Sequence, residues 1–432
     1  MKNASRTIQA LNSARPSDHP ASELEPARRK FLKGSSLLAL SAALGTQIPF
    51  GRFFPDGLIP VALAQQAVDL AAFGKSTELV VLGDRPLVAE TPAHLLDDEV
   101  TPIERLFIRN NGLPPDEASI DAAAWTLRID GESAMKEVKF TLAELKSRFR
   151  NVTQHLWIEC AGNGRSGFYP PAKGNPWTYG GVGFPTWTGV LLADVLKAVG
   201  VKRDAVYIGY FGADAHLSGD TRKPVISRGV PIGKAMQGNV ILAWAVNGQD
   251  LPLLHGYPLR LVVAGYPGSA SGKWLQQISV RNKVHDGPKM GGTDYRVPCE
   301  PIAPGEDYKN YCILEQMPVK SLITFPRSGI AHADGKPLTV RGQAWTGQKR
   351  IQAVHLSYDF GQTWIKAQVR SARNPSGPQR FTAEVKLPKK GYYEIWARAT
   401  DDTGRMQPMV VPGWNVGGYG SNAMHRIALR IA

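Results

Sequence analysis

The segment Trp157-Ile158-Glu159-Cys160-Ala161-Gly162-Asn163-Gly164-Arg165-Ser166 is the most informative stretch of the sequence. A strand expected at about 152–158 leads into a loop of small residues that carries Cys160. Glycines in such a loop allow a large ligand to approach the backbone closely. Arg165 favours the thiolate form of the cysteine, and a thiolate is a soft metal ligand. Three interpretations of Cys160 remain open: a nucleophile, a metal ligand within a pre-made cofactor, or a buried structural thiol.

The residues around this loop, from about 77 to 318, combine strand and helix patterns. Strands are predicted at 125–131, at the apolar run 240–246, which ends in the turn dipeptide Asn247-Gly248, and at 259–263. These patterns predict a mixed α/β domain, which we place at residues 65–318.

Two helices are predicted within this domain. Thr141 and Glu144 have the spacing of a capping box, which marks a helix start. The apolar residues between Leu192 and Val199 repeat at helical spacing, with Thr188 before them and Gly200 after them.

From about residue 319 the pattern changes to short alternating runs separated by turns. Such runs occur at 338–344, 351–357, 363–369, 381–387 and 392–399. Helix signals are nearly absent, and this pattern is typical of an immunoglobulin-like sandwich of about 110 residues. The expected fold class is therefore α+β: a mixed α/β domain followed by an all-β immunoglobulin-like sandwich at residues 319–432.

The first 64 residues do not have the pattern of a domain. A twin arginine occurs in Ala27-Arg28-Arg29-Lys30-Phe31-Leu32-Lys33, and a mildly apolar stretch follows at 37–44. Ala62-Leu63-Ala64 offers the small residues that a signal peptidase recognises. We expect residues 1–64 to be a twin-arginine export signal and the mature chain to be periplasmic; the alternative is a basic N-terminal arm.

The composition excludes several classes of protein. The chain has 432 residues, of which 43% are hydrophobic and 20% charged, so it is not a disordered chain. No apolar run has the 18 or so residues that a membrane span needs. The net charge of +14 comes without a basic run interleaved with aromatic residues. An oxyanion substrate or an acidic partner protein explains this charge better than nucleic acid does.

Five segments in order resemble the sulfite oxidase family of molybdopterin enzymes. These segments are Phe107-Ile108-Arg109-Asn110-Asn111, Cys160-Ala161-Gly162-Asn163-Gly164-Arg165, His255-Gly256-Tyr257-Pro258-Leu259-Arg260, Ser271-Gly272-Lys273-Trp274-Leu275, and the C-terminal Trp414-Asn415 with Ser421-Asn422-Ala423-Met424-His425-Arg426. Together they span the chain after residue 75. Residues 81–87 and 289–292 look most like haem-free, periplasmic bacterial sulfite dehydrogenases.

The resemblance implies a mononuclear molybdenum held by a pterin dithiolene, with Cys160 as the one protein ligand of the metal. It also implies a pocket in which Arg109 and Arg165 bind an oxyanion, because guanidinium groups donate paired hydrogen bonds and stay charged. Tyr295 matches the active-site tyrosine of the family. Trp177 would form a wall of the pocket, although a place in the core is an equal alternative.

The same matching assigns the pterin contacts. They are Phe107, Arg109, Asn110, Asn111, Asp214, His255, Arg260, Ser271, Gly272 and Lys273. The carboxylate of Asp214 would accept hydrogen bonds from the pterin amines. His255, Arg260 and Lys273 suit the phosphate of the cofactor, although a lone histidine such as His255 also fits a core imidazole.

The sequence departs from the family at two places in the pocket. The family's pterin-loop histidine is Asn111 here, and Gly417 stands where the vertebrate enzymes have an arginine that reaches the substrate. The anion pocket is therefore expected to have one positive charge fewer. Cys299 and Cys312 are expected to form a disulfide in an oxidising periplasm, although two separate thiols are the alternative.

No Cys-x-x-Cys-His motif occurs, and no haem-binding domain is expected before the molybdenum domain. We therefore expect electrons to pass to a separate c-type cytochrome and the sandwich to carry the contact of a homodimer. The leading interpretation is a sulfite dehydrogenase that converts sulfite and water to sulfate. The alternatives are a periplasmic molybdenum-dependent sulfoxide reductase and a secreted binding protein in which Cys160 is structural.

Overall fold

The structure is a computed structural model that describes residues 68–432 except 221 and 348. The predicted export signal and its boundary at residue 64 lie outside the described residues. Residues 68–432 form a single compact unit. Within this unit, the helices are all too short or too polar to cross a membrane.

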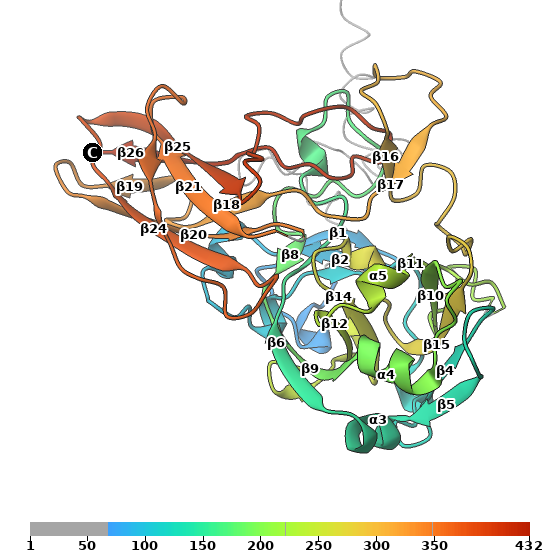
Figure 1. Ribbon diagram of the computed structural model, residues 1–432. Helices are drawn as coiled ribbons and strands as arrows, with labels where there is room; N and C mark the ends of the chain where they lie inside the picture. The colour runs from blue at the N-terminus through green and yellow to red at the C-terminus, as the bar shows by residue number, and fades with distance from the viewer. Residues whose placement is uncertain (1–67, 221, 348) are drawn as a thin grey trace, which may run out of the picture. The chain divides into compact units, whose positions relative to one another are not determined.

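Two five-stranded sheets form the centre of the first part of this unit (Figure 1). One has the order β11-β10-β15-β4-β5. The other has the order β13-β12-β9-β6, with β14 paired to β12. Their strands are β4 (Thr126–Asp130), β5 (Val138–Thr141), β6 (Asn151–His155), β9 (Thr186–Leu191), β10 (Tyr207–Gly212), β11 (Gly229–Pro231), β12 (Val240–Val246), β13 (Gln249–Asp250), β14 (Arg260–Val263) and β15 (Leu275–Arg281).

Smaller elements surround these sheets. A three-stranded sheet consists of β1 (Val80–Asp84), β2 (Leu87–Glu90) and β3 (Ile108–Arg109), and β7 (Ile158–Glu159) pairs with β8 (Val182–Gly183). The α-helices here are α3 (Leu142–Arg148), α4 (Leu192–Val199) and α5 (Ile232–Ala235). One hydrophobic core joins α4 to both five-stranded sheets, and it includes Val195, Leu127 and Leu242.

The local signals of the sequence explain where these elements begin and end. The capping box is confirmed, because the Thr141 side chain accepts from the backbone N–H of Glu144 and the Glu144 carboxylate accepts from that of Thr141. Helix α4 ends at Gly200, whose φ of 83° suits glycine. Thr188, expected just before α4, instead lies in β9, where its hydroxyl bonds that of Thr153.

The all-β sandwich is confirmed for the last part of the chain (Figure 1). Its two sheets have the orders β18-β20-β24-β23 and β19-β26-β25-β21-β22, and no helix occurs among its described residues. The strands are β18 (Lys320–Phe325), β19 (Ile330–His332), β20 (Leu338–Trp345), β21 (Ile351–Ser357), β22 (Ile365–Lys366), β23 (Gln368–Val369), β24 (Gln379–Val385), β25 (Gly391–Asp401) and β26 (His425–Ile431).

The run expected as one strand at 363–369 is divided between the two sheets. β22 pairs with β21, whereas β23 pairs with β24 in the opposite sheet. Buried Ala367 lies between them and donates its backbone N–H to the carbonyl of Val354. Alternation alone cannot reveal such a change of sheet, because both pieces keep the same period.

A hairpin of β16 (Arg296–Pro298) and β17 (Tyr311–Ile313) precedes the sandwich. The disulfide between Cys299, directly after β16, and Cys312, within β17, links the two strands of this hairpin, which confirms the predicted pairing. The predicted α+β class is confirmed as well: a mixed domain of sheets and short helices is followed by a sandwich with its own core.

Candidate active site

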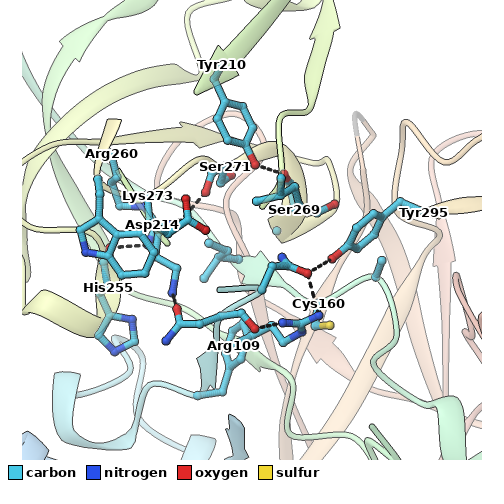
Figure 2. A pocket seen from close by; sticks show the side chains of 18 of the residues that line it. Arg109, Cys160, Tyr210, Asp214, His255, Arg260, Ser269, Ser271, Lys273 and Tyr295 are labelled. Atoms are coloured by element: carbon cyan, nitrogen blue, oxygen red, sulfur yellow. Dashed lines mark hydrogen bonds between the residues drawn. The ribbon is translucent and has the colours of Figure 1, made fainter. Parts of the chain in front are cut away.

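One cavity brings together most of the predicted site residues (Figure 2). Those that line it are Phe107, Arg109, Asn110, Asn111, Cys160, Asp214, His255, Arg260, Ser271, Lys273 and Tyr295. They come from segments far apart in the sequence, so the fold rather than local spacing assembles the site.

Cys160 is the one free cysteine of the described chain, and it is buried. The strand expected at 152–158 is in fact two strands, β6 and β7, which belong to different sheets. Short β7 ends just before Cys160, whose backbone N–H donates to the carbonyl of Gly181 at 2.8 Å. The carbonyl of Cys160 accepts from the N–H of Asn163 at 2.9 Å. Both backbone groups of the cysteine are therefore held by neighbouring residues.

Arg109, at the end of β3, lies beside Cys160 (Figure 2). Its guanidinium donates to the backbone carbonyl of Asn110 and, at 3.0 Å, to Oδ1 of Asn111. Burial alone lowers the pKa of Arg109, but nearby Tyr295 and Cys160 outweigh burial and the pKa is raised overall. Arg109 is therefore a permanent positive charge next to the thiol.

Tyr295 completes this end of the cavity. Its hydroxyl donates to Oδ1 of Asn111 at 3.0 Å, so the asparagine oxygen joins the tyrosine to Arg109. The ring of Tyr295 stacks on that of Tyr419, with centroids 5.3 Å apart, and the guanidinium of Arg228 lies 4.8 Å from the centre of the Tyr295 ring. The φ of Tyr295 is 51°, which is uncommon for a residue with a side chain and indicates a constrained backbone.

The opposite end of the cavity is rich in basic side chains. Lys273 donates to the carbonyl of Leu254 at 2.7 Å and to Oδ1 of Asn110. Burial, reinforced by the positive charges of Arg260 and Arg109, lowers the pKa of Lys273 well below its ordinary value. Burial likewise lowers the pKa of Arg260 to about 9 and raises that of Asp214 to about 6.

Lys75 supports this cationic end, although the sequence patterns did not reveal it. Its ammonium is buried and donates to the carbonyls of Ile103 and Leu106 and to Nε2 of His255, 2.5 Å away. A protonated Lys75 has no acceptor, so in that state Nε2 of His255 is the unprotonated nitrogen and Nδ1 carries the hydrogen. Burial, followed by the charges of Lys75 and Lys273, lowers the pKa of His255 well below its usual value, so His255 is a neutral donor.

Three predicted site residues do not line the cavity. The Arg165 Nε donates to the carbonyl of Gly417 at 2.7 Å and its Nη1 to that of Asn175 at 2.8 Å, so its side chain does not line this cavity. Trp177 is fully buried behind the lining residue Phe107, with ring centroids 5.9 Å apart, so the core interpretation holds for it. Gly272 has a spacing role, because a Cβ there would lie 2.4 Å from the ring of Tyr210.

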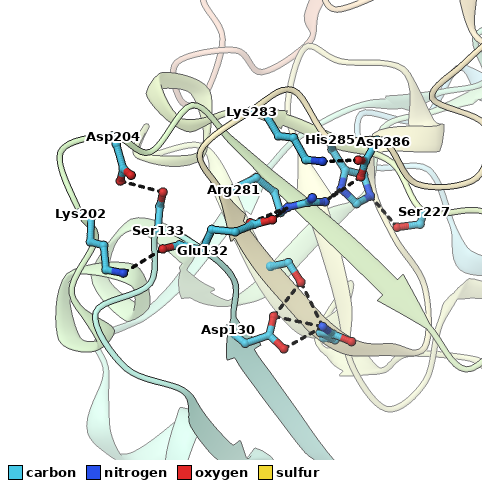
Figure 3. A network of polar contacts seen from close by, with 12 residues as sticks. Asp130, Glu132, Ser133, Lys202, Asp204, Ser227, Arg281, Lys283, His285 and Asp286 are labelled. Carbon is cyan, nitrogen blue, oxygen red and sulfur yellow. Dashed lines mark hydrogen bonds and ion pairs between the residues drawn. The ribbon is translucent and has the colours of Figure 1, made fainter.

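Tyr210 is a lining residue that the sequence patterns missed, and its backbone carbonyl is bonded to a polar network whose members Ser227, His285 and Arg281 are shown in Figure 3. The Ser227 hydroxyl donates to the Tyr210 carbonyl at 2.6 Å, so Nε2 of His285 must donate to Ser227. Nδ1 of His285 then accepts from Arg281, which also pairs with Glu132 and Asp286. Burial and the charge of Arg281 lower the pKa of His285 to about 4, so this chain of donors is fixed at neutral pH.

The residues of the cavity fit an anionic cofactor that brings its own metal ligands. Arg109, Arg260 and Lys273 face it with Asp214 as the one lining carboxylate, so an anion such as a phosphate is needed to balance the charge. Nδ2 of Asn110 is buried without a hydrogen-bond partner in the described chain. The described residues contain no cluster of three or more His, Cys, Asp or Glu side chains that could hold a metal. A molybdenum with a pterin dithiolene meets these conditions, because it needs only the one thiolate of Cys160 from the protein.

Comparisons with known proteins agree with this site. Residues 113–289 match the oxidoreductase molybdopterin binding domain, and residues 311–432 match the Mo-co oxidoreductase dimerisation domain. The chain is 34% identical to sulfite oxidase of Gallus gallus over 364 residues, which is 81% of this chain and 77% of that protein. It is 31% identical to mitochondrial sulfite oxidase of Drosophila melanogaster, covering 80% of this chain and 62% of that protein.

A solved structure resembles the whole described fold. It is the sulfane dehydrogenase SoxCD from Paracoccus pantotrophus, with a TM-score of 0.67 and 27% identity, covering 89% of this chain and 95% of that chain. The fold and the site thus define a molybdopterin-dependent oxidoreductase. The chain belongs to the sulfite oxidase family. Its cofactor is the molybdenum form of molybdopterin.

Proposed function

We propose that this protein is a sulfite dehydrogenase, which oxidises sulfite to sulfate at its molybdenum centre. The observation that carries the proposal is the half-buried guanidinium of Arg109 beside Cys160, which offers an oxyanion a fixed charge next to the metal ligand. The likeness to sulfite oxidases over most of the chain supports the same substrate.

The protein's own residues have three tasks in this reaction. The bound cofactor supplies oxygen-atom transfer and accepts two electrons. Arg109 attracts and orients the substrate anion, and its raised pKa keeps it charged throughout. Asn111 holds Arg109 and the Tyr295 hydroxyl in a fixed relation, so both face the substrate without reorganisation. Buried Phe107 and Cys160 keep water from the region around the metal ligand.

A second candidate is the oxidation of sulfane sulfur, the chemistry named for the structural neighbour from Paracoccus. One observation favours it: of the two arginines expected in the anion pocket, Arg109 lines the cavity and Arg165 does not. Arg165 is engaged by backbone carbonyls, and Gly417 carries no side chain. With one arginine beside the thiol, the cavity has less positive charge there than the pocket of the sulfite oxidases. Its preference for a doubly charged anion over a less charged substrate is therefore expected to be weaker.

A substrate screen with the purified, molybdenum-loaded enzyme separates these candidates. Sulfite and a sulfane compound such as thiosulfate are each offered with ferricyanide, and a sulfoxide is offered with a reduced viologen. Sulfite turnover with a kcat/KM far above that of thiosulfate supports the leading proposal. Preference for the sulfane compound overturns it in favour of the second candidate, and sulfoxide reduction overturns both.

We also propose that the protein works in the periplasm as a homodimer that passes electrons singly to a c-type cytochrome. The twin-arginine segment and the match to a dimerisation domain support this proposal. The signal holds eight basic and four acidic residues, so the mature chain keeps about ten of the 14 net positive charges. This basic surface favours an acidic face on the cytochrome.

Two measurements test these partners. Light scattering at micromolar concentration gives the mass, and a monomer would contradict the dimer. Stopped-flow reduction of the cytochrome over a salt series tests the steering, since screening beyond a Debye length of about 10 Å at 0.1 M salt slows an attractive encounter. A rate that stays constant or rises with salt would contradict attraction by opposite charges.

A further inference from the structure

Glu159, the residue before Cys160, is a fully buried carboxylate that the reaction does not use. Its Oε1 accepts from the Lys320 ammonium at 2.5 Å and from Nδ2 of Asn163 at 2.9 Å. Its Oε2 accepts from the indole N–H of Trp345 at 2.9 Å. All the polar groups of this cluster that face Glu159 are therefore satisfied, which makes it a rigid network inside the protein.

Two of the three donors come from the sandwich. Lys320 opens β18 and Trp345 closes β20, and the two residues are paired across the sheet. A third contact from the sandwich reaches the other side of the cysteine, because the backbone N–H of Gly420 donates to the carbonyl of Ala161 at 2.9 Å. The sandwich thus holds the residues immediately before and after Cys160.

The network reaches the backbone of the cysteine through Asn163. The side chain of Asn163 donates to Glu159 and accepts from the N–H of Gly181, while its own backbone N–H donates to the carbonyl of Cys160. The N–H of Cys160 in turn donates to the carbonyl of Gly181. A displacement of Glu159 would therefore be transmitted to both backbone groups that fix the cysteine.

We infer that the sandwich completes the molybdenum site: Lys320 and Trp345 are positioning residues that hold the Cys160 loop through Glu159. The inference rests on Cys160 being the protein ligand of molybdenum. It gives the second domain a role in the chemistry of each subunit, in addition to the contact between subunits that its family description names.

The chain offers a matched control for a contact that is only structural. Arg341, also in β20, pairs with Asp97 at 2.6 Å and so joins the sandwich to the first domain as Lys320 does. Neither residue of this pair contacts the Cys160 loop through any hydrogen bond of the described chain. Arg341→Met therefore removes an ion pair between the same two parts without touching the loop.

The experiment compares Lys320→Met, Glu159→Gln and the double variant with Arg341→Met. The first readout is the rate at which iodoacetamide alkylates the full-length chain prepared without cofactor, where Cys160 is the one free thiol of the described residues. We expect Lys320→Met to react about ten- to a hundredfold faster, since a charged hydrogen bond no longer restrains the loop. The second readout is the Mo(V) electron paramagnetic resonance spectrum of the holoenzyme, which we expect to change because the angle at the thiolate ligand changes.

The double variant should return both readouts toward those of the wild type, because it removes both buried charges together. Trp345→Phe keeps an aromatic ring but removes the indole N–H that donates to Glu159. This variant replaces Lys320→Met in the experiment if Lys320→Met does not fold. Alkylation rates and spectra that match those of Arg341→Met in both Lys320→Met and Trp345→Phe would overturn the inference. A wild-type molybdenum spectrum in Cys160→Ser would instead overturn the ligand role of Cys160, so the two failures are distinguishable.

Discussion

The two ends of the cavity differ in how their polar groups are stabilised. At the thiol end, Cys160, Arg109 and Tyr295 are already joined to neighbours by hydrogen bonds, and the sandwich braces the cysteine loop. At the far end, Arg260 and Lys273 lie close together beside neutral His255, and Asp214 is the one lining carboxylate. The thiol end is preorganised before any ligand arrives, whereas the cationic end is balanced only by an anion.

This difference assigns a separate task to each end. Groups that are fixed in advance stabilise charge that develops during a reaction without moving. Groups that repel one another in the free protein gain most when an anionic ligand binds, because the ligand removes an existing penalty. We therefore expect substitutions at the thiol end to impair turnover and substitutions at the cationic end to impair retention of the cofactor.

The largest effect is expected from Cys160→Ser. A hydroxyl is a harder and far less acidic ligand than a thiol, so sulfite oxidation should fall to near the background of the assay. The pterin should be retained, since the cationic end is unchanged. Pterin fluorescence after release and the kcat for sulfite measure the two quantities. Turnover like that of the wild type would remove Cys160 from the site.

A smaller effect is expected from Arg109→Gln. Loss of a charged hydrogen bond to the anion is worth roughly 1.5–3 kcal/mol, or about ten- to a hundredfold in kcat/KM for sulfite. Arg165→Gln is the matched comparison, and it should lower kcat/KM less because Arg165 bonds backbone carbonyls outside the cavity. Equal losses in both variants would show that Arg165 also contacts the substrate.

The cationic end is tested by Lys273→Met. We expect the molybdenum and pterin content of the purified protein to fall by up to about tenfold, because one charged donor to the phosphate is lost. The kcat per bound molybdenum should change little. Lys234→Met is a suitable control, since Lys234 is a buried lysine outside this cavity. A full cofactor content with a reduced kcat per molybdenum would reverse the assignment of the two ends.

The smallest effect is a dependence of stability on pH caused by Lys75. Burial lowers the pKa of Lys75 to about 7, against an ordinary value of 10.5 in the unfolded chain. Between these values the unfolded chain binds the extra proton, so the stability of the cofactor-free protein should rise with pH, by about 1 kcal/mol per unit. Lys75→Met should reduce this slope by that amount between pH 7 and 9, measured by urea unfolding, while Lys234, whose pKa is also lowered to about 7, keeps its own share. Exposed Lys390→Met should keep the slope, and a slope unchanged in Lys75→Met would contradict the assignment.

The sequence predicted the parts of the fold whose cause is local. Thr141 and Glu144 form their capping box from neighbours three residues apart, and Asn247-Gly248 adopts the positive φ angles of a tight turn. The alternation after residue 319 likewise revealed the sandwich. The division of 363–369 between two sheets and the break between β6 and β7 depend on distant partners, so local patterns did not reveal them.

The same limit applies to the site. The motif of Cys160, Arg165 and their neighbours identified the correct loop, but the side chain of Arg165 turns toward Gly417, which is 252 residues away in the sequence. Lys75 and Lys320 lie in no motif, and each acts through a residue more than 150 positions away. Sequence motifs are recognised by short spacings between residues, so they cannot reveal a partner that lies this far along the chain.

Gly417 also restricts how this pocket can evolve. A Cβ on Gly417 would lie 2.2 Å from Cε2 of Tyr419, and that ring is itself fixed by its stack on Tyr295. An arginine of the vertebrate kind at this position would first have to displace the Tyr419 ring, which supports the pocket. The residue at position 419 is therefore expected to decide whether a side chain at position 417 is tolerated. The two positions are expected to be epistatic, because the residue at one restricts which residues the other can accept.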